Sequence, residues 1–66
     1  MNIILNGKPT EIELSCTITQ LLESLGLAGK PVVIEHNKVA VFPRDYALTS
    51  LAESDQLEII NIAAGG

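Results

Sequence analysis

Basic residues are scarce in this sequence, with four lysines and arginines against eight acidic residues and a net charge of −4. Binding to nucleic acid needs a positively charged surface that neutralises phosphates, so this balance argues against a nucleic-acid partner. Apolar runs are short as well. None approaches the roughly 18 residues of a transmembrane helix, and no charged segment followed by an apolar run begins the chain as a signal peptide. The sequence therefore predicts no membrane partner.

Cysteine and histidine are almost missing. Cys16 cannot form an internal disulfide because it is the one cysteine, and a free thiol suits a reducing compartment, here the cytoplasm. His36 has no second ligand at metal-binding spacing, so we expect it to end a strand rather than to bind a metal ion. Asp55 and Glu58 are expected at solvated positions. Phosphate-binding glycine loops and catalytic triads are absent too, so we expect no bound cofactor, no metal and no catalytic residue.

The length of 66 residues is enough for one domain, which buries about 60% of the surface of its unfolded chain. Because 47% of the residues are hydrophobic and 3% are aromatic, isoleucine, leucine and valine must fill the core. So small a core leaves little room for an enclosed cleft of several hundred Å³. The length thus argues against an enzyme.

The beginning of the chain predicts a β-hairpin. Ile3 and Leu5 alternate with their neighbours before Asn6-Gly7, and Ile12 and Leu14 alternate with glutamates after it. An Asn-Gly pair tolerates the positive φ of a tight turn, so this pattern on both of its sides is a strong hairpin signal. The second strand is expected to include Ile12 and Leu14.

A helix is predicted after the hairpin. Its apolar stripe falls at positions i, i+3, i+4 and i+7, which are Ile18, Leu21, Leu22 and Leu25. Thr17 and Gln20 have the spacing of a capping box, and Gly26 is placed to end the helix in a left-handed conformation. Cys16 stands where a hydrophobic staple packs against Leu21, so we interpret it as a small apolar residue rather than a nucleophile.

Three further strands are predicted. Residues 32–34 begin one that runs to a turn near Asn37-Lys38, residues 39–41 form a short return strand, and Gln56–Ile62 form the last. A turn and a short helical piece separate the last two. This order predicts an α+β fold, a mixed sheet with one helix across one face. With the first and last strands as central neighbours, it is a β-grasp (ubiquitin-like) domain over residues 1–62.

Four small residues follow the last predicted strand, namely Ala63, Ala64, Gly65 and Gly66. A chance Gly-Gly pair at this place has a probability of roughly half a percent, because glycine makes up about 7% of residues. We expect residues 63–66 to form a flexible tail that reaches roughly 13 Å beyond the sheet, into a partner's active site. A free α-carboxyl group has a pKa of about 3.5, so the Gly66 carboxylate is ionised and can attack an activated phosphate. The protein is thus predicted to be a substrate that presents its tail.

The last predicted strand has two different sides. Leu57 and Ile59 fall on the side toward the helix, whereas Glu58, Ile60 and Ile62 fall on the other. The helix covers one face of so small a sheet. Exposed isoleucines beside a reactive tail are best explained as a partner surface, unless loops or a dimer contact cover them. We therefore predict partner contacts at Glu58, Ile60 and Ile62.

Several motifs stand at fixed places along the chain. They are “NG” after the first strand, Asn37, Pro43-Arg44 followed by Tyr46, and “SDQLEI” and “AAGG” after Leu51. Together they resemble the ThiS family of sulfur-carrier proteins of thiamine biosynthesis over essentially the whole chain. Ser54 departs from the family pattern, which usually has glycine before the aspartate.

The resemblance implies a mechanism. An E1-like adenylating enzyme would use ATP and Mg to adenylate the Gly66 carboxylate, and a persulfide sulfur donor would then convert it to a thiocarboxylate. Thiazole synthase would take this sulfur for the thiazole ring of thiamine. ATP and Mg would therefore act in the activating partner.

Three alternatives stay open. A molybdopterin-synthase small subunit (MoaD-like) uses the same tail chemistry, and a ubiquitin-like modifier would be joined to lysines of other proteins. A β-grasp interaction module that does not react needs no free Gly-Gly end, so the sequence “AAGG” counts against it.

Overall fold

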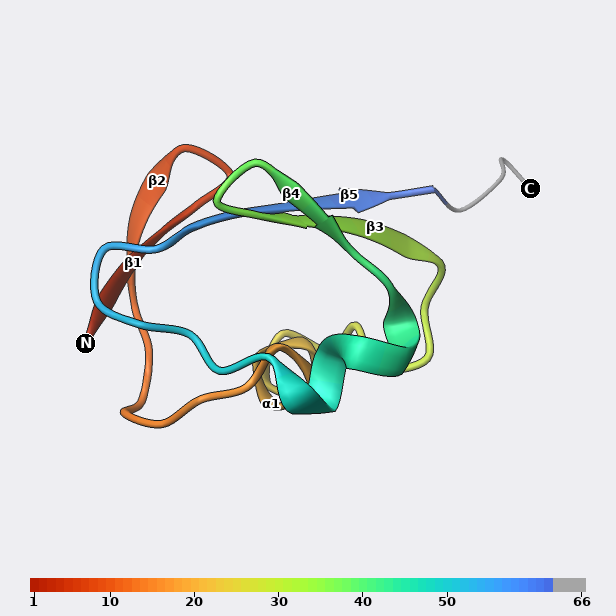
Figure 1. Cartoon of the computed structure of the whole chain (residues 1–66), viewed down its shortest axis with the longest axis horizontal. Coiled ribbons are helices and arrows are strands. Elements are labelled where there is room, and N and C mark those ends of the chain that lie inside the picture. The colour runs from red at the N-terminus through yellow and green to blue at the C-terminus, as the bar shows by residue number, and fades with distance from the viewer. Residues whose placement is uncertain (63–66) are drawn as a thin grey trace.

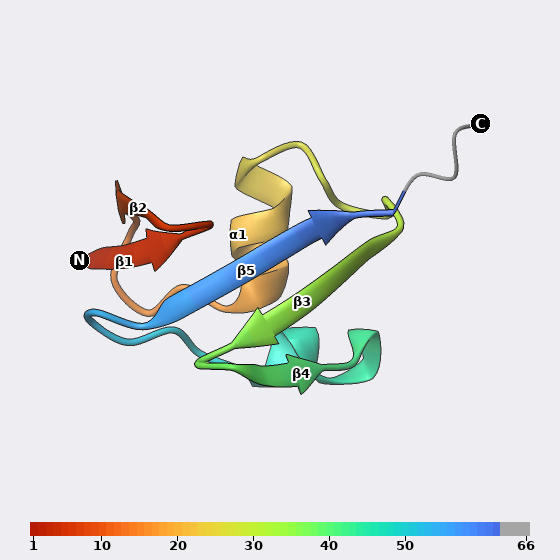
Figure 2. The same ribbon diagram turned by 90° about the horizontal axis from the view of Figure 1, so that it is seen from above.

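The computed structural model describes residues 1–62, and the predicted tail residues Ala63, Ala64, Gly65 and Gly66 lie outside this described part. Within residues 1–62 a five-stranded mixed sheet carries one α-helix across one face (Figure 1). Seen from above, the strands lie in front of the helix, which leaves the other face of the sheet toward the viewer (Figure 2). The predicted α+β fold is confirmed.

The N-terminal hairpin consists of β1 (Asn2–Leu5) and β2 (Lys8–Glu11). Asn6 and Gly7 have φ values of +49° and +81°, the left-handed backbone that a tight hairpin turn requires. The prediction that β2 includes Ile12 and Leu14 is wrong, because the strand ends at Glu11 and Leu14 is 77% exposed. The chain turns at Ser15, where φ is +60°, and leaves the sheet toward the helix.

Helix α1 (Ile18–Ser24) begins at the predicted capping box. Thr17 Oγ1 accepts a hydrogen bond from the Gln20 amide at 3.2 Å, and Gln20 Oε1 accepts one from the Thr17 amide at 2.9 Å. Two of the orphan N–H groups at the start of the helix are thereby satisfied. Among residues 1–62, no helix is long and apolar enough to cross a membrane.

The C-terminal end of α1 has the predicted left-handed residue, Gly26, with φ +74°. The Leu27 amide donates to the Leu22 carbonyl at 2.8 Å, as in a Schellman motif. Leu25 is the C-cap and is 42% exposed, so the fourth position of the predicted stripe does not join the core.

The remaining elements follow the predicted order. They are β3 (Val32–His36), β4 (Val39–Val41), the 3-10 helix η1 (Pro43–Leu48) and β5 (Gln56–Asn61). Strand β5 lies at the centre of the sheet, whose strand order is β2-β1-β5-β3-β4. It is parallel to β1 and antiparallel to β3, so the predicted neighbourhood of the first and last strands is confirmed.

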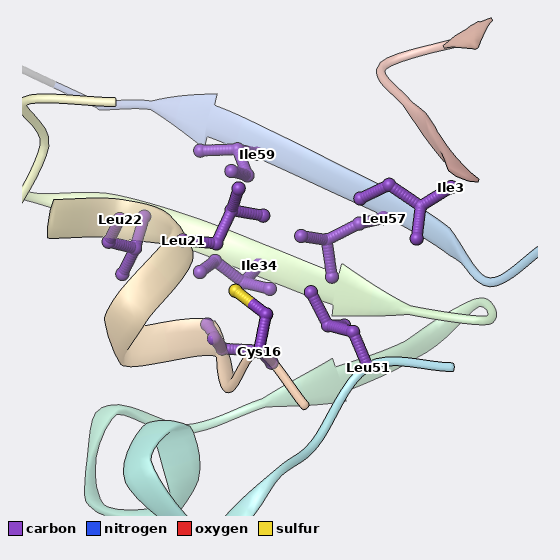
Figure 3. Close-up of a cluster of buried hydrophobic side chains, with 9 residues drawn as sticks. Ile3, Cys16, Leu21, Leu22, Ile34, Leu51, Leu57 and Ile59 are labelled. Carbon is purple, nitrogen blue, oxygen red and sulfur yellow. The ribbon is translucent and has the colours of Figure 1, made fainter. Parts of the chain in front are cut away.

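The core lies between the sheet and α1 and is aliphatic, as the composition predicts (Figure 3). Its buried members are Ile3, Cys16, Ile18, Leu21, Leu22, Ile34, Leu51, Leu57 and Ile59. Cys16 and Leu21 both belong to this cluster, as expected of the two positions of a hydrophobic staple. The cluster fixes the centre of β5 through Leu57 and Ile59.

Ser54 has φ +69°, within the left-handed region that residues with a Cβ rarely adopt. This backbone explains why the family pattern has glycine at this position, since glycine enters the region without steric cost. The Ser54 amide donates to the Asn2 carbonyl at 2.8 Å and so ties the loop before β5 to the start of β1. Serine therefore keeps the turn at an expense of about 1 kcal/mol of backbone strain.

Candidate functional site

The candidate site is the C-terminal part of β5 with the open face of the sheet beside it. Asn6 pairs with β5 through its side chain, because Asn6 Oδ1 accepts from the Ile59 amide at 2.7 Å and Asn6 Nδ2 donates to the Ile59 carbonyl at 3.2 Å. The Ile62 amide donates to the Pro31 carbonyl at 3.0 Å. The strand is thus held on the β1 side as far as Ile59 and on the β3 side as far as Ile62. The site predicted on Ala63, Ala64, Gly65 and Gly66 lies outside the described residues.

The two sides of β5 differ as the alternation predicts. Leu57 and Ile59 are 0% and 8% exposed and belong to the core, whereas Ile60 and Ile62 are each 52% exposed. Glu58 is exposed on the same side as the two isoleucines. No described loop buries this side, so the surface is available, while the predicted partner contacts at Glu58, Ile60 and Ile62 stay a prediction.

The register of β3 against β5 enlarges the open face. Val33 lies opposite Ile60, and Glu35 lies opposite Glu58. Val33 is 40% exposed and Glu35 is exposed. Neither residue was predicted at the site, because the pairing of two strands more than twenty residues apart is not encoded in local periodicity.

Asp55, just before β5, is not solvated as predicted. Its Oδ2 lies 2.6 Å from His36 Nε2 and accepts from the Ala52 amide at 2.9 Å, and its Oδ1 accepts from Asn37 Nδ2 at 3.2 Å. The side chain is 13% exposed. His36 ends β3, as predicted, and its Nε2 contacts this carboxylate.

The pKa of Asp55 is lowered as a net result of opposing causes. Burial is the largest single influence and by itself raises the pKa, but the hydrogen bonds from His36, Ala52 and Asn37 and the charge of His36 together outweigh it. A carboxyl group with a lowered pKa stabilises the folded state fully at pH values above its ordinary pKa. This stabilisation is lost as the pH falls through the lowered pKa.

Asp55→Asn is expected to lower the unfolding free energy at neutral pH by about 1–2 kcal/mol, because it removes the charged acceptor of these hydrogen bonds. Below a pH of about 4 the difference from the wild type should shrink, since the wild-type carboxyl group is then protonated as well. Urea unfolding between acidic and neutral pH measures both effects. Asp45→Asn is the control, because Asp45 is 45% exposed and lies 3.9 Å from Arg44. A constant difference at every pH would contradict this role of Asp55.

Cys16 is buried, and burial first and the nearby Glu13 second raise the pKa of its thiol. The thiolate is the nucleophilic form of cysteine, so a buried thiol with a raised pKa reacts poorly at neutral pH. In addition, no three His, Cys, Asp or Glu side chains in residues 1–62 converge to hold a metal ion. What the described residues do offer is the exposed surface of Glu58, Ile60 and Ile62 on β5.

Several known proteins are similar to this chain in sequence or in structure. The ThiS family model matches residues 3–66. The sulfur carrier protein ThiS of Bacillus subtilis is 35% identical over 63 residues, which are 94% of this chain and 96% of that protein. The crystal structure of a thiamine biosynthesis protein (ThiS) from Geobacter metallireducens superposes with a TM-score of 0.85 at 29% identity, over the whole of both chains.

Two longer relatives are named thiazole synthase. That of Magnetococcus marinus is 39% identical and that of Paramagnetospirillum magneticum 32% identical over 66 residues, the whole of this chain. The chain spans 20% of the length of each of these proteins. In them a domain similar to this chain is therefore joined to a much larger remainder.

Proposed function

The chain belongs to the ThiS family of sulfur carriers of thiamine biosynthesis, and we propose that the carboxylate of Gly66 is the group that carries the sulfur. The observation that supports this most strongly is that the family match runs to residue 66 and so includes the glycine pair. A glycine carboxylate is ionised at neutral pH and has no side chain beside it, so a narrow active site can admit it.

The proposed reaction sequence begins in an E1-like adenylating enzyme that holds ATP and Mg. A Gly66 carboxylate oxygen attacks the α-phosphorus of ATP, and pyrophosphate leaves. The terminal sulfur of a persulfide donor then attacks the acyl carbon and AMP leaves, which gives an acyl disulfide. A thiol attacks the donor's own sulfur in that bond, so that the donor departs as a disulfide and Gly66 keeps a thiocarboxylate.

Thiazole synthase is the proposed acceptor of this sulfur. The relatives of Magnetococcus marinus and Paramagnetospirillum magneticum that carry a similar domain are themselves named thiazole synthase. Joining two proteins in one chain is consistent with a reaction between them. These names favour the thiamine pathway over a molybdopterin-synthase subunit, a protein modifier and a module that does not react. The cytoplasm is the proposed compartment, because the free thiol of Cys16 suits reducing conditions.

The domain itself is proposed to act as a carrier, with no catalytic residue of its own. Its contribution is to hold β5 rigidly and to present Glu58, Ile60 and Ile62 to the activating enzyme beside the tail. Preorganised positioning of a reacting group supplies a large part of a catalysed reaction's barrier reduction, about 7–11 kcal/mol in favourable cases. The position of Gly66 relative to this docking surface of Glu58, Ile60 and Ile62 therefore matters more than any chemistry in the body of the domain.

ATP–pyrophosphate exchange tests the proposal. The purified chain, incubated with the E1-like adenylating enzyme of the same organism, Mg-ATP and labelled pyrophosphate, should make exchange depend on the concentration of the chain. Adenylate formation is reversible, so label enters ATP only if the carboxylate is adenylated. Exchange that is the same with and without the chain would contradict the proposed function.

A further inference from the structure

The open face of the sheet carries two like charges directly opposite each other. Glu35 on β3 and Glu58 on β5 are register partners, and both are exposed. Like charges at such a position destabilise an antiparallel pair. Within residues 1–62 neither glutamate has an ion pair, because the ion pairs there are His36 with Asp55 and Arg44 with Asp45. The free domain therefore contains a repulsion that its own described residues do not relieve.

Apolar residues continue the face beside this acidic pair. Val33 and Ile60 are the next pair of register partners on the same side, 40% and 52% exposed, and Ile62 is 52% exposed. On the other flank Ala40 of β4 lies opposite Glu35, and its small side chain leaves the glutamates accessible. The acidic pair thus borders the exposed apolar side chains of Val33, Ile60 and Ile62, on the face of the sheet opposite α1, which Figure 2 shows toward the viewer.

We propose that Glu35 and Glu58 together bind one arginine side chain of the activating enzyme. Apolar side chains beside that arginine on the enzyme cover Val33, Ile60 and Ile62. This inference rests on the proposed function and adds the chemistry of the partner. A guanidinium group suits the position better than an ammonium group, because its planar set of five N–H donors reaches two carboxylates at once. The chain's net charge of −4 also favours a partner with a positively charged surface.

The arrangement has a distinctive consequence, because the same two charges oppose folding and favour binding. In the free domain they repel each other. In the complex the single positive charge of the arginine lies between the two carboxylates and offsets much of this repulsion, and each carboxylate accepts a hydrogen bond from the guanidinium group. Removal of one charge should therefore move stability and affinity in opposite directions, whereas a residue with a merely structural role would move both in the same direction.

Glu35→Gln and Glu58→Gln, singly and together, test the inference. Each single variant should raise Tm by about 1–4 °C, as expected from relief of a cross-strand repulsion in a small domain. Each should weaken binding to the E1-like adenylating enzyme by about threefold to tenfold at low ionic strength and reduce its salt dependence. Glu23→Gln is the matched control, because Glu23 is exposed on α1 and its substitution changes the net charge equally.

Two measurements test the inference. Calorimetric titration at low and at physiological ionic strength measures the affinity for the enzyme, and an adenylation assay at saturating concentration of the chain measures the reaction itself. Equal affinities for Glu58→Gln and Glu23→Gln, with normal adenylation, would overturn the arginine site and leave the proposed function intact. A fall of both Tm and affinity in the glutamine variants would also overturn it, because the pair would then be structural. If the wild-type chain is not adenylated at any concentration, the proposed function fails and this inference fails with it.

Discussion

Deletion of Gly66 should abolish adenylation of the chain by its activating enzyme and leave the Tm of the domain unchanged. The deletion moves the terminal carboxylate back by one residue, roughly 3.5 Å. In an enzyme active site a misplacement of about 1 Å can already reduce the rate by a factor of about 100. The rate of ATP–pyrophosphate exchange that remains should therefore be too low to detect.

The unchanged Tm follows from the position of the core. Ile59 is the last buried residue among residues 1–62, and the later residues Ile60 and Ile62 are exposed. A peptide tag after Gly66 should have the same effect as the deletion, since it converts the carboxylate to an amide. Protease removal of that tag to leave Gly66 as the last residue is the control and should restore exchange. Normal exchange with the deletion variant or the tagged protein would show that another group is activated.

Ile60→Asp should weaken binding to the activating enzyme at least tenfold while the domain stays folded. Burial of an isoleucine side chain against a partner contributes about 1.5–3 kcal/mol, and about 1.4 kcal/mol corresponds to a factor of ten in affinity. The aspartate also places a charge in an apolar contact, which adds to the loss. Ile60 is 52% exposed in the free domain, so its replacement leaves no cavity in the core.

Calorimetric titration of the variant against the activating enzyme measures this effect, and thermal unfolding verifies that the domain is intact. Leu14→Asp is the matched control, because Leu14 is 77% exposed in the loop after β2, away from the open face. The control should bind like the wild type. Equal affinity of Ile60→Asp and wild type, with both folded, would remove Ile60 from the docking surface. Unfolding of Ile60→Asp would mean that Ile60 supports the fold instead of a partner contact.

Most of the fold was predictable because its signals are local. The turn at Asn6-Gly7, the capping box of Thr17 and Gln20 and the left-handed Gly26 are each specified by residues within one turn of the chain. The errors lie where tertiary structure ended an element early. Leu14 continued the alternation of its strand in the sequence, yet the chain had to leave the sheet to begin the helix.

The candidate site was only partly predictable. The two sides of β5 follow from alternation, so the exposure of Ile60 could be predicted from the sequence. Glu35 could not, since its place opposite Glu58 depends on the register of β3 against β5. The pairing of His36 with Asp55 joins residues 19 positions apart, and no local pattern encodes it. Long-range pairing is what the sequence leaves undetermined in this domain.

The most direct test of the carrier role is the intact mass of the protein isolated from cells that are making thiamine. We predict a species in which one oxygen atom is replaced by one sulfur atom, and fragmentation should place this change at Gly66. The species should disappear after alkaline hydrolysis and be missing from cells that lack the adenylating enzyme. If the protein from such thiamine-producing cells shows only the unmodified carboxylate, or carries the sulfur at Cys16 instead, the proposed role of Gly66 as the sulfur carrier is contradicted.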